Sequence, residues 1–209
     1  MIWLNIIIQG VLTGGLYAMF AAGLALIFGV MRLVNIAHGD LIVLAAYLAL
    51  VTIDALALNP LAAIVIVAPV TGAIGYALQR GLLNRTVGDD LLPPLLVTFG
   101  LSVIIQNGLL ELFTADSRRL SAGAIEVASF PLIEGISIGV LPLVQFIAAI
   151  VIIGGLGSMW GTLVGGIVLG VAQAVGAQIN PGWQLLAGHL AFLAVLAVRP
   201  QGLFPKVQG

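Results

Sequence analysis

The chain has 209 residues, of which 61% are hydrophobic and only 7% are charged, and its formal net charge is −1. Soluble domains carry roughly a quarter charged residues, so this composition excludes a soluble globular protein and indicates a membrane protein. The balanced charge provides no basic surface for nucleic acid, and we expect no nucleic acid partner. The absence of cysteine excludes disulfides and thiolate metal sites.

Charged and turn-forming residues divide the chain into seven hydrophobic segments. A helix needs about 20 apolar residues to cross the hydrocarbon core of a bilayer. Between Glu134 and Arg199, 64 consecutive residues carry no charge, which is enough for about three crossings. The predicted spans cover residues 2–30, 41–58, 61–78, 95–113, 138–153, 160–177 and 183–198. We therefore predict an all-α fold, a polytopic integral membrane bundle of about seven transmembrane helices in one domain (1–209), with one or two helices broken or re-entrant.

Basic residues near the span ends predict the orientation, because cytoplasmic loops carry an excess of Lys and Arg. If the loop at residues 79–94 is cytoplasmic, five basic residues lie inside and only Arg118 and Arg119 lie outside. We therefore expect the N-terminus outside and the C-terminal tail in the cytoplasm.

Small residues recur every four residues in two places, and such ridges allow helix backbones to approach closely inside a membrane. The ridges are Gly10, Gly14, Ala18 and Ala22 in the first helix, and Gly157, Gly161 and Gly165, with Gly166 and Gly170 beside them, in the second-last span. They predict helix packing, either within the chain or at a dimer seam.

Two helices carry polar stripes with helical spacing. The stripes are Gln9, Thr13 and Tyr17 in the first helix, and Thr98, Ser102 and Gln106 in the fourth. Polar residues inside a membrane usually face the bundle or a water path. These stripes either line a hydrophilic path for a substrate or join helices by hydrogen bonds, each worth about 0.6–2 kcal/mol.

The densest polar cluster, Asn35, His38 and Asp40, follows the first helix. His38 and Asp40 could form a proton relay; a metal site lacks a third nearby ligand, and we expect neither a metal nor a cofactor. In the structural alternative, Gly39 breaks the helix and the three polar side chains bind the freed backbone groups.

The sequence contains no phosphate-binding G-x-x-x-x-G-K-[ST] loop, no nucleophile elbow and no H-E-x-x-H motif. We therefore expect that the chain is not an enzyme. The energy for any transport must come from a partner or from an ion gradient.

Four motifs, spread in order over nearly the whole chain, point to one family. They are Gly14-Gly15-Leu16-Tyr17-Ala18 with Asn35-Ile-Ala-His-Gly-Asp40, then Thr98-Phe-Gly-Leu-Ser102, then Gly154-Gly-Leu-Gly157 with its following glycines, and finally Arg199-Pro-Gln-Gly-Leu203. Together they resemble the permeases of branched-chain amino-acid ABC transporters. The Asn35–Asp40 motif favours the H-type leucine/isoleucine/valine permease.

The resemblance implies a translocation subunit in the bacterial inner membrane for branched-chain or related amino acids, with amides or urea as the nearest alternative substrates. It also implies partners: a second homologous permease, two cytoplasmic ATPase subunits that hydrolyse ATP, and an extracytoplasmic substrate-binding protein. In such a system substrate specificity rests largely with the binding protein.

The chain departs from the family in length, because its 209 residues fall roughly 80 short of a typical member. The resemblance locates an internal deletion seam within residues 137–146, where the family's long cytoplasmic loop that docks on the ATPase would be expected and is missing. Loss of two spans and that loop would preserve the orientation of everything downstream. Two alternatives to an importer subunit follow: a transport-inactive relative that acts only in assembly or interaction, and a proton-coupled carrier that uses His38 and Asp40.

Overall fold

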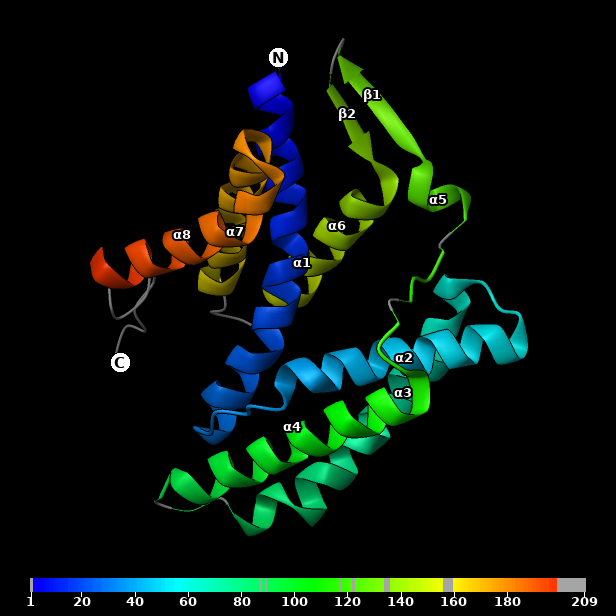
Figure 1. Ribbon diagram of the computed structural model, residues 1–209, viewed down its shortest axis with the longest axis vertical. Coiled ribbons are helices and arrows are strands. Elements are labelled where there is room, and N and C mark those ends of the chain that lie inside the picture. Colours follow the sequence, from blue (N-terminus) through cyan, green and yellow to red (C-terminus); the bar gives the residue numbers. More distant parts are fainter. Residues whose placement is uncertain are drawn as a thin grey trace. The chain divides into compact units, whose positions relative to one another are not determined.

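The computed structural model describes residues 2–86, 88, 90–116, 118–121, 123–133, 136–155 and 160–198. Within these ranges the chain forms helices and one two-stranded sheet (Figure 1). The helices are α1 (Ile2–Met31), α2 (His38–Leu56), α3 (Pro60–Gly81), α4 (Leu92–Phe113), α5 (Ala124–Val127), α6 (Val140–Gly155), α7 (Trp160–Ile179) and α8 (Gln184–Val198), with 3-10 turns η1 (Leu83–Arg85) and η2 (Pro181–Trp183).

The helices confirm the prediction of a polytopic helical membrane protein. Six of those in the described ranges are long and apolar enough to cross a membrane: α1, α2, α3, α4, α7 and α8, the last together with η2. The remaining predicted span, 138–153, corresponds to α6, which is apolar but has only 16 residues. At about 1.5 Å per residue α6 is roughly 24 Å long, shorter than a hydrocarbon core of about 30 Å.

Local sequence explains where the helices begin. Pro60 occupies the first turn of α3, where its missing N–H is not needed. The side chain of Asn59 caps the same helix, since its Oδ1 accepts a hydrogen bond from the Leu61 N–H at 2.9 Å. The preceding helix α2 ends at Leu56, and the next residue, Ala57, adopts a left-handed conformation with φ of 48°. Together these residues turn the chain sharply between α2 and α3.

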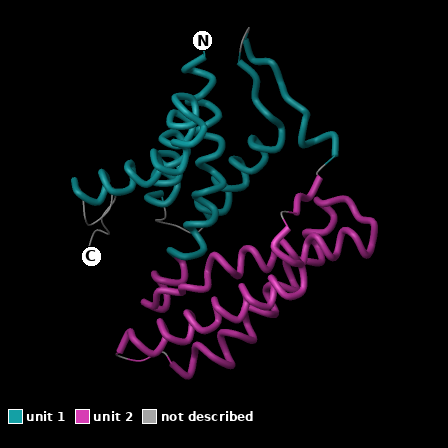
Figure 2. Tube along the Cα trace, in the orientation of Figure 1, with its two compact units in different colours: residues 1–25, 123–209 teal, residues 26–122 magenta. Residues whose placement is uncertain are grey.

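The chain divides into two compact units (Figure 2), which are described separately. Unit 1 comprises residues 1–25 and 123–209, and unit 2 comprises residues 26–122. In unit 1 the first part of α1 and the helices α6 and α7 share a small apolar core of Ala18, Ala22, Ile153 and Leu163. α8 folds back onto α7 after the turn at Pro181–Trp183.

Glycines let α1 and α7 meet backbone to backbone in unit 1. A Cβ added at Gly14 would lie 2.5 Å from Ile167 Cα and 2.8 Å from the Gly166 carbonyl oxygen. A Cβ added at Gly170 would collide with the carbonyl oxygen of Gly10. Such distances leave no room for a side chain, so the helices approach as closely as their backbones permit.

The face of α7 that contacts α1 is adjacent to the one suggested by the spacing of Gly157, Gly161 and Gly165. Gly165 has nothing within 4 Å of a built Cβ, whereas Gly166 and Gly170 make the contact. Consecutive residues of a helix are rotated by about 100°, so two neighbouring four-residue glycine repeats face different directions. Gly157 lies outside the described residues.

A β-hairpin, not predicted from the sequence, precedes α6. β1 (Ser129–Ile133) pairs antiparallel with β2 (Ile136–Gly139), and Phe130 lies opposite Ile138. β2 leads directly into α6 at Val140. The proposed deletion seam at residues 137–146 therefore coincides with a continuous junction between the hairpin and α6.

Candidate functional site

The turn between α1 and α2 contains the first residue of the polar cluster. Arg32 follows α1 with a φ of 54°, and α2 begins at His38. The helix break therefore lies at residues 32–37, and Gly39, expected as the breaking residue, is inside the first turn of α2. Asn35 is buried, and its Oδ1 accepts a hydrogen bond from the backbone N–H of Ala37 at 3.0 Å. Asn35 thus stabilises the turn itself.

Asp40, half-buried two residues into α2, points toward α4 within unit 2. Its carboxylate accepts a hydrogen bond from Ser102 Oγ at 2.5 Å and another from Gln106 Nε2 at 3.0 Å. Gln106 Nε2 also lies 3.1 Å from Ser102 Oγ, which closes a three-residue network. The structure therefore joins one residue of the Asn35–Asp40 motif to two residues of the polar stripe on α4.

The remaining members of these motifs have other surroundings. Thr98 is fully buried, and its hydroxyl donates to the Pro94 carbonyl of its own helix at 2.9 Å. His38 is half-buried at the start of α2. Tyr47 and Phe113 stack further along the same helices, with ring centroids 4.4 Å apart. Because Asp40 meets Ser102 and Tyr47 meets Phe113, α2 and α4 run in the same direction.

The polar stripe of α1 lies in unit 1 and joins helices there. Tyr17 Oη donates a hydrogen bond to Gln173 Oε1 of α7 at 2.6 Å. Gln9 Nε2 donates to the Ser137 carbonyl of β2 at 2.7 Å. Thr13, between them, is exposed. Gln173 was missed by the sequence analysis, although a glutamine in the middle of an apolar span is the signal that could have found it.

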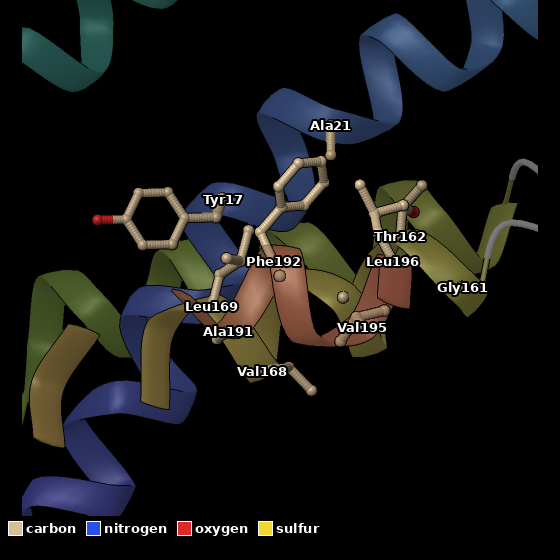
Figure 3. Close-up of a pocket in the computed structure, with 12 residues that line it drawn as sticks. Tyr17, Ala21, Gly161, Thr162, Val168, Leu169, Ala191, Phe192, Val195 and Leu196 are labelled. Carbon is tan, nitrogen blue, oxygen red and sulfur yellow. The ribbon is translucent and has the colours of Figure 1, made fainter. Parts of the chain in front are cut away.

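Tyr17 also lines an apolar pocket of about 260 Å³ in unit 1. Figure 3 shows its walls, which come from α1, α7 and α8. Gly161 and Gly165 form part of the lining and Phe192 of α8 contributes an aromatic ring. These two glycines, which the sequence suggested as packing residues, thus border a pocket between α7 and its neighbours α1 and α8.

Metal binding finds no geometric support in the described part of the chain. There, no three His, Asp or Glu side chains gather closely enough to hold an ion. The polar network around Asp40 contains one carboxylate, one hydroxyl and one amide. These groups can bind a cationic or zwitterionic solute or another side chain, by hydrogen bonding and charge.

Comparison with known families identifies the chain. The model of the family described as "branched-chain amino acid transport system / permease component" matches residues 6–119, which is more than half of the sequence. The chain belongs to this family. The matched segment contains the Asn35 turn and the whole Asp40–Ser102–Gln106 network, so the network lies in the part of this permease that matches the family model.

Similar proteins cover nearly the full chain. The permease is 24% identical to the high-affinity branched-chain amino acid transport system permease protein BraD of Pseudomonas aeruginosa, over 99% of this chain and 97% of BraD. It is 21% identical to the permease protein LivH of Salmonella typhimurium and to LivH of Escherichia coli K12, over 96% of this chain and 95% of each relative. No solved structure matches the chain.

The alignment with BraD also bears on the length of the chain. It extends over 299 positions, whereas this permease has 209 residues, so at least 90 positions lie opposite gaps in the permease. Both ends of the two proteins are nevertheless covered almost completely. The shortening is therefore internal, as expected from the motifs.

Proposed function

We propose that this chain is the transmembrane permease subunit of an ABC importer for branched-chain or related amino acids. The observation that carries the proposal is the likeness to BraD and LivH along nearly the full length of both partners. Six helices long and apolar enough to cross a membrane, found in the described ranges, support a translocation role. ATP hydrolysis belongs to separate subunits, since this sequence has no phosphate-binding loop.

The Asp40–Ser102–Gln106 network is the part of the chain best suited to contact the substrate. Placing a carboxylate within a span costs about 2.5–3.5 kcal/mol of free energy on insertion scales. Such a carboxylate therefore usually pairs with another residue or contacts a substrate or ion. Two donors hold the Asp40 carboxylate in a fixed position, and its remaining lone pairs can accept from a substrate ammonium group. Asn35 supports this site by fixing the turn from which α2 begins.

The partners in this proposal are a second homologous permease, two cytoplasmic ATPases and an extracytoplasmic binding protein. The exposed apolar side chains of α3, among them Val65 with 76% of its surface exposed, fit contact with lipid or with the second permease. The internal shortening removes surface that relatives have, and recovery of the ATPases with this chain is therefore the decisive assembly test.

The proposal is tested by uptake of radiolabelled leucine, isoleucine and valine in cells that co-express the chain with its genomic neighbours. Replacing Asp40 with Asn should lower uptake by about tenfold or more at equal membrane levels, because a lost charge-assisted interaction is worth about 1.5–3 kcal/mol. Glu111→Gln is the matched control, since Glu111 is an exposed carboxylate on α4 and outside the network.

Two results would contradict the proposal. The first is wild-type chain in the membrane that supports no uptake of any branched-chain amino acid. The second is a detergent pull-down that recovers the folded chain without any ATPase. Equal loss of uptake in the Asp40 and Glu111 variants would instead show that the network has no specific role in uptake.

A further inference from the structure

A second polar site lies in unit 2, at the C-terminal end of α2. A cavity of about 630 Å³ opens between the last turns of α2 and the segment that follows α4. Its wall includes two acidic side chains, Asp54 and Asp116, and two basic ones, Arg118 and Arg119. All four are exposed and therefore accessible to a small molecule. Cavities of about 300–1,000 Å³ are typical of small-molecule sites.

An apolar pocket continues from this cavity. It has a volume of about 310 Å³ and is lined by Val43, Ala46 and Tyr47 of α2. Leu50, Arg118 and Leu120 line both spaces, so the charged cavity and the apolar pocket share a wall. A ligand that bridges them would present charged groups to one and an apolar body to the other.

The position of the site along α2 also fits a role in transport. Asp54 is 14 residues beyond Asp40, so the two lie about 21 Å apart along the helix axis. The distribution of basic residues predicts that Arg118 and Arg119 face the extracytoplasmic side. With this orientation the charged cavity lies at the extracytoplasmic end of α2 and α4. The Asp40 network lies toward the other end of α2.

We propose that this composite site receives the zwitterionic amino acid before it enters the membrane, a step that rests on the proposed import function. Arg118 and Arg119 bind the substrate carboxylate, for which the guanidinium fork has matching geometry. Asp54 and Asp116 accept from the ammonium group, and the aliphatic side chain enters the apolar pocket. Thr114 Oγ1 donates to Asp116 Oδ2 at 2.9 Å and so holds this carboxylate in place.

The chemistry of the cavity favours an amino acid over the phosphate group of an anionic lipid. Two arginines alone would suit either ligand, but a phosphate would be repelled by the two carboxylates in the same wall. A zwitterion satisfies both signs of charge at once. The adjacent apolar pocket further favours branched aliphatic side chains over glycine.

The test measures binding of radiolabelled leucine to the purified full chain in nanodiscs of phosphatidylcholine. The competitors are glycine, which lacks the side chain, 4-methylpentanoate, which lacks the ammonium group, and isoamylamine, which lacks the carboxylate. Unlabelled leucine should compete best. Each analogue should need a concentration at least about tenfold higher for half-maximal competition, as expected for one lost charged or apolar interaction. Arg118→Gln and Asp54→Asn should weaken leucine binding to a similar extent, whereas Arg85→Gln, in η1 beyond the C-terminal end of α3, should leave it unchanged.

The outcomes separate this site from the import function. Leucine binding that is unaffected by Arg118→Gln and Asp54→Asn overturns the site, and so does binding of 4-methylpentanoate as tight as that of leucine. Arginine-dependent binding that disappears when phosphatidylglycerol is added assigns the cavity to a lipid phosphate. If the same variants import leucine normally with their partners, the site fails while the import function stands; if the wild type imports nothing, the import function itself fails.

Discussion

The close contact of α1 with α7 provides the sharpest test of the packing in unit 1. Gly165 and Gly166 are adjacent on α7, but a Cβ at Gly166 would lie 2.5 Å from the Gly14 carbonyl oxygen and 2.7 Å from Ala18 N, whereas a Cβ at Gly165 meets nothing within 4 Å. Both Gly→Ala changes gain the same helix propensity, about 1 kcal/mol. Only Gly166→Ala must push backbone atoms apart, and overpacking of this kind costs about 1–3 kcal/mol.

The free energy of unfolding should therefore differ between the two variants by about 1–3 kcal/mol, with Gly166→Ala the less stable. The propensity terms cancel in this comparison, so the difference isolates the steric cost. The assay is reversible denaturation in mixed micelles of a mild detergent and sodium dodecyl sulfate. Circular dichroism follows the helices, and the fluorescence of Trp160 and Trp183 reports on both ends of α7.

Equal stability of Gly165→Ala and Gly166→Ala would refute the packing argument. It would mean that α1 and α7 are not in backbone contact at Gly166, or that they separate at no cost. A larger loss at Gly165 would indicate that the other glycine face of α7 makes the contact.

Three further predictions follow from individual contacts and from the charge distribution. Tyr17→Phe removes the hydrogen bond to Gln173 and should lower the stability of unit 1 by about 0.6–2 kcal/mol, measured in the same micelles; an additive double-mutant cycle with Gln173→Leu would show that the bond contributes nothing. Asn35→Ala leaves the buried Ala37 N–H without its acceptor and should cost about 1–3 kcal/mol, whereas an unchanged unfolding midpoint would exclude a role for Asn35 in the turn. A reporter fused after Gly209 should be active in the cytoplasm, and a periplasmic reading would overturn the predicted orientation.

The helical architecture could be predicted from the sequence because charge is excluded from a bilayer. Each of the seven predicted spans largely coincides with a helix, and residues such as Asn59 and Pro60 marked the turns where spans end. The structure of the segment before α6 was not predicted from the sequence. There a short β-hairpin forms, and its pairing depends on contacts across the strands that no helical or hydropathy pattern reveals.

The polar motifs were identified from spacing, but their partners could not be. Helical spacing placed Thr98 beside Ser102, yet Thr98 bonds to its own backbone and Ser102 to Asp40. The hydrogen-bond partner of each hydroxyl depends on small differences in the rotation of one helix relative to the next. The sequence does not specify these rotations. Gln173 escaped notice for the same reason, since only the approach of α1 to α7 makes it a partner of Tyr17.

The glycine contact between α1 and α7 has a consequence for how a transport cycle can proceed. No side chain lies between the two backbones at Gly14 and Gly166, so there is no rotamer whose change could ease sliding or rotation of one helix past the other. The first part of α1 should therefore move together with α7 as one rigid body whenever the permease opens or closes. Because the chain has no native cysteine, a pair of cysteines introduced beside this contact, at positions that leave its glycines in place, can be cross-linked selectively. Such a cross-link should leave leucine uptake intact, whereas inhibition would show that the two helices separate during the cycle.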